Sequence, residues 1–377
     1  MKNFFASRKG IISVGLFIGV FAAILQKLGN PKNMGICVAC MERDIAGALG
    51  LHRAAVVQYM RPEIIGFVIG AFIAALIFKE YKARGGSAPI ARFVLGFFAM
   101  IGSLVFLGCP WRALLRLSGG DGNAITGILG LVAGIWIGVL FIKSGYNLGR
   151  SRKTYSFTGL LFPITMVAFL LLLLFHPKLP SGAVFFSEKG PGAMHAPLLI
   201  SLLVAIAIGF LAQRTRFCTM GAFRDLILIR DTHLLSGIIA LVVGAFVTNL
   251  IFKQFHPGFI NQPIAHNNYL WNFGGMVLAG LAFALAGGCP GRQLFMSGEG
   301  DGDAAVFVLG MFAGAAFAHN FAAASSPSGP AIWGPASVIV GLAVCIVMGF
   351  AMRGRVSENN SNEMCPKTIC KKRSNKP

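Results

Sequence analysis

The sequence is short of charge, and above all of acidic charge. Only 12% of its 377 residues are charged, and 13 Asp and Glu stand against 33 Lys and Arg. A soluble globular domain carries about 25% charged residues, so this composition excludes a soluble domain and a disordered chain. The mean hydropathy of +0.72 also excludes a nucleic-acid-binding module, although the chain is strongly basic.

Several functional motifs are missing as well. The sequence has no Walker-type phosphate loop, which excludes an ATPase subunit. It has no acidic residue in the middle of an apolar segment, where many proton pumps carry one. The histidines lack metal-ligand spacing, so we expect neither a metal nor a cofactor. The basic N-terminus leads into an apolar stretch without a small-residue cleavage site, and we expect no cleaved signal.

The apolar residues instead form ten long segments. A membrane-spanning helix needs about 20 residues, and long blocks favour helices over the alternating strands of a barrel. We therefore predict an all-α integral membrane protein with about ten transmembrane helices. The segments are 11–26, 63–78, 93–108, 124–142, 157–175, 196–212, 234–252, 271–288, 303–322 and 332–352.

The basic residues predict an orientation for these helices. With ten spans and an inner N-terminus, 23 Lys and Arg fall on the inner side and 10 on the outer side. Because basic loops stay in the cytoplasm, this asymmetry predicts a multi-pass protein of the bacterial inner (plasma) membrane with both termini cytoplasmic. The net charge of +20 is then a feature of topology and gives no reason to expect a nucleic-acid partner.

Two short motifs each occur twice in the chain. The tripeptide Gly-Cys-Pro recurs after 180 positions with a following Arg and Asp-Gly, and a Cys-x5-Arg-Asp motif recurs after 181 positions. Two motifs with nearly the same offset indicate an internal duplication. The matched positions are Cys37, Arg43 and Asp44 with Cys218, Arg224 and Asp225, and Cys109, Pro110, Arg112 and Asp121 with Cys289, Pro290, Arg292 and Asp301.

The duplication predicts two repeats of opposite topology. Each half holds five predicted spans, and an odd number inverts the second half, as in many secondary transporters. We expect residues 30–145 to superpose on 212–325 only after inversion. The predicted parts are a first repeat at 1–156, a connecting helix and outer loop at 157–195, a second repeat at 196–352 and a basic cytoplasmic tail at 353–377.

The repeated motifs are interpreted as four short re-entrant helices that meet near the midplane. Pro is favoured at the first helical position, so Pro110 and Pro290 predict helix starts that put Cys109 and Cys289 at the N-cap. A helix N-terminus attracts anions and lowers the pKa of a thiol. With Arg112 and Arg292 one turn further on, the motifs suit a small anion that has a sulfur or selenium end.

The remaining cysteines and histidines leave alternatives open. Cys40 completes Cys-x-x-Cys with Cys37 but aligns with Gly221, so it is either a redox or metal partner or an incidental residue. Cys345 fits a core position, and His319 fits a packed, hydrogen-bonded position better than the path. The tail pair Cys365 and Cys370 could accept cargo or bind metal, or could be spare thiols; we expect it to be dispensable for transport.

Most acidic residues lie in or beside the repeated motifs, where we expect them to hold arginines. Asn123 and Asp303 are expected to cap the spans that follow. The expected pairs are Asp44 with Arg43 or a partner elsewhere, Asp225 with Arg224 or a partner elsewhere, Asp121 with Arg112, and Asp301 with Arg292.

The segment FCTMGAFRD at 217–225, with GCPWR and GGCPGR, resembles the YeeE/YedE family of sulfur-compound transporters. The form of the motifs is similar to the branch called selenium metabolism membrane protein YedE, and the resemblance covers roughly residues 30–352. It implies a non-enzymatic transporter or channel for thiosulfate or a related sulfur or inorganic selenium species. Carried over by motif, the path thiols are Cys109, Cys218 and Cys289, with Cys37 as the first-half counterpart. A cytoplasmic sulfur or selenium carrier protein is a candidate partner.

A membrane thiol-disulfide oxidoreductase that uses Cys37 and Cys40 is the alternative. Such an enzyme needs a cycling disulfide on one side of the membrane, whereas a transport path can work with every thiol reduced. The cysteines here are spread over both halves, and this distribution favours transport.

Overall fold

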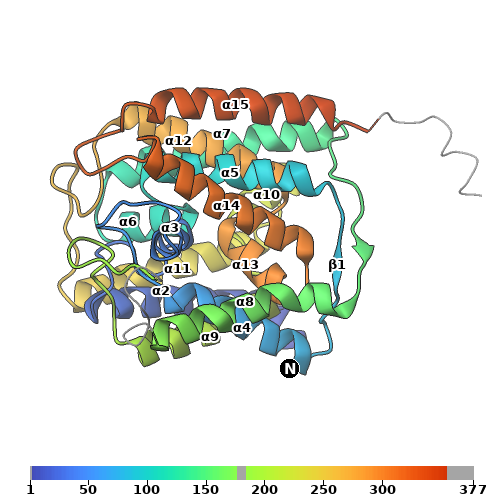
Figure 1. The fold of residues 1–377 in the computed structure, drawn as a ribbon, viewed down its shortest axis with the longest axis horizontal. Helices are drawn as coiled ribbons and strands as arrows, with labels where there is room; N and C mark the ends of the chain where they lie inside the picture. The colour runs from blue at the N-terminus through green and yellow to red at the C-terminus, as the bar shows by residue number, and fades with distance from the viewer. Residues whose placement is uncertain (1, 176–183, 355–377) are drawn as a thin grey trace, which may run out of the picture.

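The computed structural model describes residues 2–175 and 184–354. The long helices lie side by side along a common direction, so that their ends form two opposite faces (Figure 1). One face carries the start of the first long helix and two short strands, β1 (Arg84–Gly85) and β2 (Arg152–Lys153), and we call it the β face. The other face carries the loops 28–36, 49–61 and 252–268, and we call it the loop face. Cys365 and Cys370 lie outside the described residues.

The prediction of an all-α integral membrane protein is confirmed. The described residues contain nine helical stretches that are long and apolar enough to cross a membrane, and α4 adds a tenth apolar helix of 16 residues. Each helix coincides with a predicted segment to within a few residues at its ends. The ten helices are α2 (Arg8–Lys27), α4 (Pro62–Ile77), α5 (Pro89–Phe106), α7 (Asn123–Lys143), α8 (Ser156–Phe175), α9 (Leu198–Thr215), α11 (His233–Ile251), α12 (Tyr269–Ala286), α14 (Gly302–Asn320) and α15 (Gly334–Ala351).

Four short helices carry the repeated motifs, in addition to the terminal turn α1 (Lys2–Phe5). They have 9 to 11 residues, too few to cross a membrane. The first two follow helices that end at the loop face, and the last two follow helices that end at the β face (Figure 1). The short helices are α3 (Val38–Ala48), α6 (Pro110–Ser118), α10 (Thr219–Ile229) and α13 (Pro290–Gly298).

The long helices pair across the two halves of the chain. Helix α2 packs against α11, α4 against α9, α5 against α14 and α7 against α12. The two members of each pair run in the same direction: Gly15 of α2 lies against Gly237 of α11, and Gly19, one turn later, lies against Leu241. The two halves are therefore interlocked and do not form separate bundles.

Glycine makes these close pairings possible. An added Cβ at Gly15 would overlap the carbonyl oxygen of Gly237, and one at Gly134 of α7 would overlap that of Val277 in α12. Lipid tails are as apolar as the helix surfaces, so membrane helices associate through close backbone packing at small residues. The chain has 48 Gly residues, and many of those in the long helices lie at such contacts.

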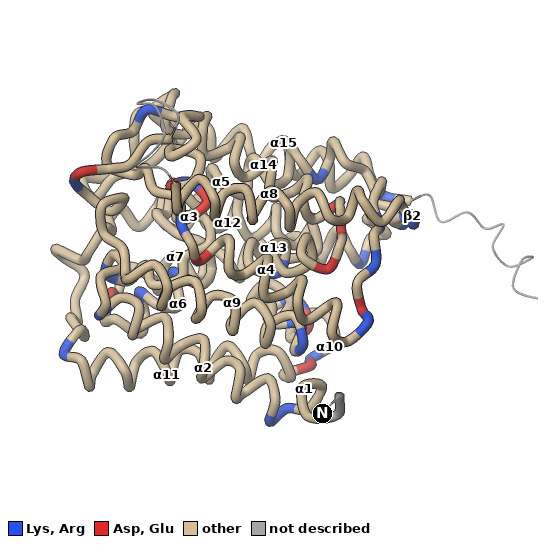
Figure 2. The backbone as a smooth tube through the Cα atoms, turned by 60° about the horizontal axis from the view of Figure 1, so that its bottom comes forward, with Lys and Arg blue, Asp and Glu red and all other residues tan. Residues whose placement is uncertain are grey.

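Charged residues gather at the two faces and around the short helices, while α8, α12 and α15 carry none (Figure 2). The side chains of Ile164, Leu171, Val340 and Val347 on α8 and α15 are exposed. Such a surface is stable only where lipid covers it.

We expect Gly15→Ala to lower the thermal stability of the purified protein in detergent, because its Cβ meets the backbone of α11. Overpacking of this kind costs about 1–3 kcal/mol. Gly274→Ala is the matched control: it also lies in a long helix, but its Cβ has its nearest neighbour at 3.7 Å. The control should unfold at the wild-type temperature or slightly above it, and equal losses in both variants would contradict the packing argument.

Candidate functional site

The first thiol pair joins α3 and α6. Cys37 and Cys109 precede these helices as their N-cap residues, and their sulfur atoms lie 3.7 Å apart. Both side chains are buried. The Cys37 sulfur accepts a hydrogen bond of 3.4 Å from the backbone N–H of Cys40, so the thiol occupies the position that a Ser or Asp usually takes at a helix start.

The second thiol pair repeats this arrangement between α10 and α13. Cys218 and Cys289 are the N-cap residues, their sulfur atoms are also 3.7 Å apart, and Cys218 accepts from the backbone N–H of Gly221 at 3.2 Å. The structure thus brings together the four cysteines as two pairs, one within each half. In the described part of the chain, the two Gly-Cys-Pro cysteines do not contact each other.

Proline begins the helix in both Gly-Cys-Pro motifs, as the sequence predicts. Pro110 and Pro290 occupy the first turn of α6 and α13, and neither N-cap side chain makes a capping hydrogen bond to the helix. Proline has no N–H to leave unpaired at this position. The other free backbone N–H groups of the first turn carry a partial positive charge, and this charge lies beside the sulfur.

Arg112 gives the first pair a buried positive charge that has no acidic partner in the described part of the chain. Its side chain is fully buried; Nη1 donates to the Cys40 sulfur at 3.2 Å, and Nη2 donates to the Ile264 carbonyl at 3.0 Å. Within the described residues Nε has no hydrogen-bond partner. Cys40, whose role the sequence left open, therefore orients this arginine beside the thiol pair.

Arg292, the counterpart of Arg112, is more accessible. It forms an ion pair with Glu299 at 3.1 Å and lines a cavity of about 520 Å³ together with Cys218. Arg214, Arg216 and other residues near the helix ends at the β face complete the lining. A neighbouring basic cavity of about 310 Å³ shares Arg216 and Arg292. Cys218 of the second thiol pair thus faces a cavity at the β face.

The predicted partners of two acidic residues are wrong. Asp121 pairs with Arg116 at 2.6 Å instead of Arg112, and Asp301 pairs with Arg84 at 2.7 Å instead of Arg292. The reason is that, in each half, a loop of the opposite half lies against the turn that follows the short helix. Residues 84 and 301 pair through their backbones, as do residues 258 and 121. The first loop places Arg84 beside Asp301, but the second places Gly258 beside Asp121, so Asp121 pairs with Arg116 of the preceding helix α6.

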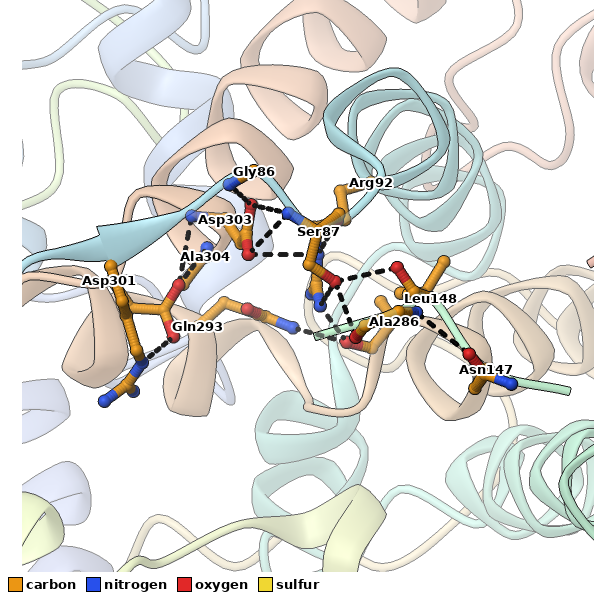
Figure 3. Close-up of polar contacts among 12 residues, drawn as sticks. Gly86, Ser87, Arg92, Asn147, Leu148, Ala286, Gln293, Asp301, Asp303 and Ala304 are labelled. Atoms are coloured by element: carbon orange, nitrogen blue, oxygen red, sulfur yellow. Dashed lines mark hydrogen bonds and ion pairs between the residues drawn. The ribbon is translucent and has the colours of Figure 1, made fainter. Parts of the chain in front are cut away.

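The predicted helix caps are displaced by two residues. Asp301, and not Asp303, caps α14 by accepting from the backbone N–H groups of Asp303 and Ala304. Asp303 instead accepts from the backbone N–H groups of Gly86 and Ser87 (Figure 3). Its carboxylate thereby fixes the loop that follows α4 on the β face.

Asn123 is not a cap either. Its backbone N–H and its side-chain amide both donate to Asp121 at 2.9 Å, and the amide also donates to the Phe259 carbonyl at 2.8 Å. Asp121 and Asp301 therefore do the same work in the two halves, because each accepts a backbone N–H at the start of the following helix.

Asp44 and Asp225 pair with the arginines beside them. Asp44 contacts Arg43 at 2.7 Å and also Arg61 at 2.7 Å, and all three side chains are buried. Asp225 contacts Arg224 at 2.8 Å, but 32% of the arginine and 18% of the aspartate side chain remain exposed. Arg61 in turn donates to the carbonyls of residues 191 and 194, so this ion pair also holds the loop before α9 in place.

The histidines and Cys345 lie outside the thiol pairs. His319 stacks on His52 with ring centroids 4.5 Å apart, and Cys345 is buried within α15. Burial lowers the pKa of His52 and His266 in the loop-face loops below the usual value. The His52 ring contacts the backbone carbonyl of Arg43, and the His266 ring contacts that of Val105. In the described residues there is no cluster of three His, Cys, Asp or Glu that could hold a metal ion.

The sequence interpretation missed an aromatic cluster between the two thiol pairs. Trp111 follows Cys109 by two residues, and its ring packs edge to face on Phe67 and Phe217 at 5.8 and 6.1 Å and tilted on Phe295 at 6.1 Å. All four rings are buried. The alignment of the two motifs contained the signal, because Trp111 is matched by Gly291 inside an otherwise duplicated segment.

The fold and the site define a polytopic α-helical membrane protein with two buried thiol pairs at the starts of short helices. The family described as sulphur transport matches residues 214–362 of the chain, which include the second pair. A thiosulfate transporter, TsuA of Escherichia coli K12, is 29% identical over 108 residues, 28% of this chain and 30% of the relative. TsuA of Spirochaeta thermophila is 30% identical over 99 residues, 26% of this chain and 29% of the relative.

An uncharacterized protein of Methanocaldococcus jannaschii, MJ1590, is 34% identical over 87 residues, 20% of this chain and 83% of the relative. The chain belongs to the YeeE/YedE family of sulfur transporters. The matches span about three-tenths of the length of the two thiosulfate transporters.

We expect Asp44→Asn to be far more destabilising than Asp225→Asn, although the two residues occupy the same position of the repeated motif. The first change leaves two buried arginines without a full counter-charge, and breaking a buried pair costs about 3–5 kcal/mol. The second breaks a partly exposed pair worth up to about 1 kcal/mol. Thermal unfolding of both variants in detergent measures the difference, and similar losses would contradict the role of burial.

Proposed function

We propose that the protein is a transporter or channel that carries a small sulfur-containing anion across the inner membrane, past its two thiol pairs. The observation that carries the proposal is the repeated arrangement of paired thiols, a helix N-terminus and an arginine in each half. Membership of a sulfur transport family and the similarity to proteins named thiosulfate transporters support it. A thiosulfate-like anion is the proposed substrate, and an inorganic selenium species is the alternative substrate.

The chemistry of each thiol pair suits such an anion. Backbone N–H groups and Arg112 or Arg292 attract the oxygens, while the thiols contact the soft terminal atom. Thiols are weak hydrogen-bond donors, so they hold the ion without trapping it. Conduction needs binding that is favourable enough for the ion to enter and weak enough for it to leave.

We also propose that the two halves are inverted repeats. An operation that superposes the first half on the second places α2 on α9 and α4 on α11. It converts the helix pair α2–α11 into the helix pair α9–α4, and the structure contains both pairs. Because consecutive spans alternate in direction, and the members of each pair run in parallel, α2 and α9 run in opposite directions. The fifth helices depart from this relation: α8 packs on α4 and α13, whereas α15 packs on α12 and α5.

The orientation follows from the basic residues. Lys79, Lys82, Arg84, Arg214 and Arg216 gather around the cavities of the β face. Under the positive-inside rule we propose that this face is cytoplasmic, as are both termini. An anion that has passed Cys218 then enters the basic cavity, where a cytoplasmic sulfur or selenium carrier protein can receive it.

The oxidoreductase alternative would use a disulfide between Cys37 and Cys40. The Cys37 side chain interacts with Cys40 as well as with Cys109, and the Cys40 sulfur also accepts from Arg112. The repetition of a thiol pair in the second half, where Gly221 takes the place of Cys40, favours transport. Turnover of that disulfide in the purified protein would favour the alternative.

Uptake of radiolabelled thiosulfate and selenite into proteoliposomes, each in competition with the other, tests the proposal. We expect Cys109→Ser and Cys289→Ser to lower uptake about tenfold or more, equivalent to about 1.4 kcal/mol in the barrier, because oxygen is a hard atom. Thermal stability should stay near wild type.

Cys345→Ser is the matched control, since Cys345 is buried in α15 away from both pairs. It should transport at the wild-type rate. Wild-type uptake by both path variants would show that the soft-thiol mechanism is wrong.

A further inference from the structure

We propose that Trp111 is the gate between the two thiol pairs, and that its indole N–H binds the anion that passes. This inference deepens the proposed function and rests on it for the identity of the anion. The barrier itself is a property of the structure and can be tested without transport.

The ring bridges the two half-sites. Trp111 belongs to α6, whose N-cap is Cys109, but it packs on residues of the second site: Phe217, which precedes Cys218, and Phe295 of α13. Gly291, two residues after Cys289, also lies against it. A substrate that moves from one thiol pair to the other therefore has to displace this ring or pass its edge.

The duplication explains why one ring, and only one, fits here. The repeat matches Trp111 with Gly291, and a Cβ added at Gly291 would lie 3.1 Å from the Trp111 ring. Two bulky residues at matched positions would overlap where the halves meet. One half therefore supplies the ring and the other half supplies the space, in a segment where Cys, Pro and Arg are all kept twice.

The exposure of the cysteines agrees with a closed gate. Cys218 lines the cavity that opens on the β face and is 6% exposed, whereas its partner Cys289 is 1% exposed, and Cys37 and Cys109 on the far side of Trp111 are 0% and 1% exposed. Phe67 and Phe295 back the indole from α4 and α13. A cluster of packed rings excludes water, and apolar constrictions of this kind close a pore to hydrated ions.

The indole N–H gives the gate a donor for an anion. Within the described residues Trp111 Nε1 is buried and has no hydrogen-bond partner, although a buried indole N–H usually finds one. The rim of an aromatic ring is electropositive and its face is electronegative, so an anion passes at the edge, where the N–H donates. A small oxyanion with a soft sulfur end keeps one contact to the ring and one to a thiol, whereas sulfate has no soft end.

Thiol labelling tests the barrier. An anionic, membrane-impermeant methanethiosulfonate is applied from the β face to the purified protein in oriented vesicles, and the labelled cysteines are identified by peptide mass spectrometry. In the wild type we expect label on Cys218 and little on Cys37 or Cys109. In Trp111→Ala the two outer thiols should label at least tenfold faster.

Two further variants keep the result interpretable. Phe307→Ala removes another buried ring, on α14 and outside the cluster, and should leave the labelling pattern unchanged. The double variant Trp111→Gly with Gly291→Trp moves the ring to the other half and should restore protection. The gate would be overturned if Cys37 and Cys109 were labelled in Trp111→Ala no faster than in the wild type. It would also be overturned if Phe307→Ala raised their labelling rate as much as Trp111→Ala does.

Uptake then separates the gate from the proposed function. Trp111→Phe keeps a ring but loses the N–H, and we expect it to lower thiosulfate uptake about tenfold. Wild-type uptake by this variant would overturn the anion-binding role of the N–H. If wild-type protein carries no thiosulfate, the proposed function fails, while the labelling result still decides whether Trp111 closes the path.

Discussion

A helix that ends inside a membrane leaves backbone N–H groups that neither lipid nor water can satisfy, and the architecture of this protein depends on meeting that constraint. Four short helices begin within the bundle. Two begin with a thiol that accepts a backbone N–H, at Cys37 and Cys218. Two begin with a proline that has no N–H, at Pro110 and Pro290. The groups that solve the structural problem are therefore the groups that form the site.

The long helices enclose the four short ones. Because pairs such as α2–α11 meet at glycine, their backbones come close enough to seal the bundle around the thiols. The buried ion pairs have a related task. Asp44, Asp121 and Asp301 each hold an arginine and so fix a loop or turn beside a short helix. Among the described residues Arg112 has no acidic partner, and its guanidinium donates instead to the Cys40 sulfur and the Ile264 carbonyl.

Much of this could be predicted from the sequence, since hydropathy defines the ten long helices and the duplicated motifs define the four short ones. The same motifs identify the four cysteines, but not that they pair within each half, Cys37 with Cys109 and Cys218 with Cys289. The acidic partners could not be predicted, because whether Asp301 meets Arg84 or Arg292 depends on which loop of the other half reaches it. Cys40 and Trp111 were underestimated for a similar reason. Neither is duplicated: Cys40 meets Arg112 only when α3 and α6 of the first half pack together, and Trp111 meets Gly291 only when the two halves interlock.

The pairing of helices across the halves also has a consequence for how the chain is made. Helices α2, α4, α5 and α7 leave the ribosome long before their partners α11, α9, α14 and α12. Until then, faces such as that of Gly15 and Gly19 contact only lipid, and the thiols of α3 and α6 lack their full cover. The first half is thus an insertion intermediate that waits for the second. A ribosome stalled after α8 would leave a product with no folded core, which makes it a natural substrate for membrane quality-control proteases.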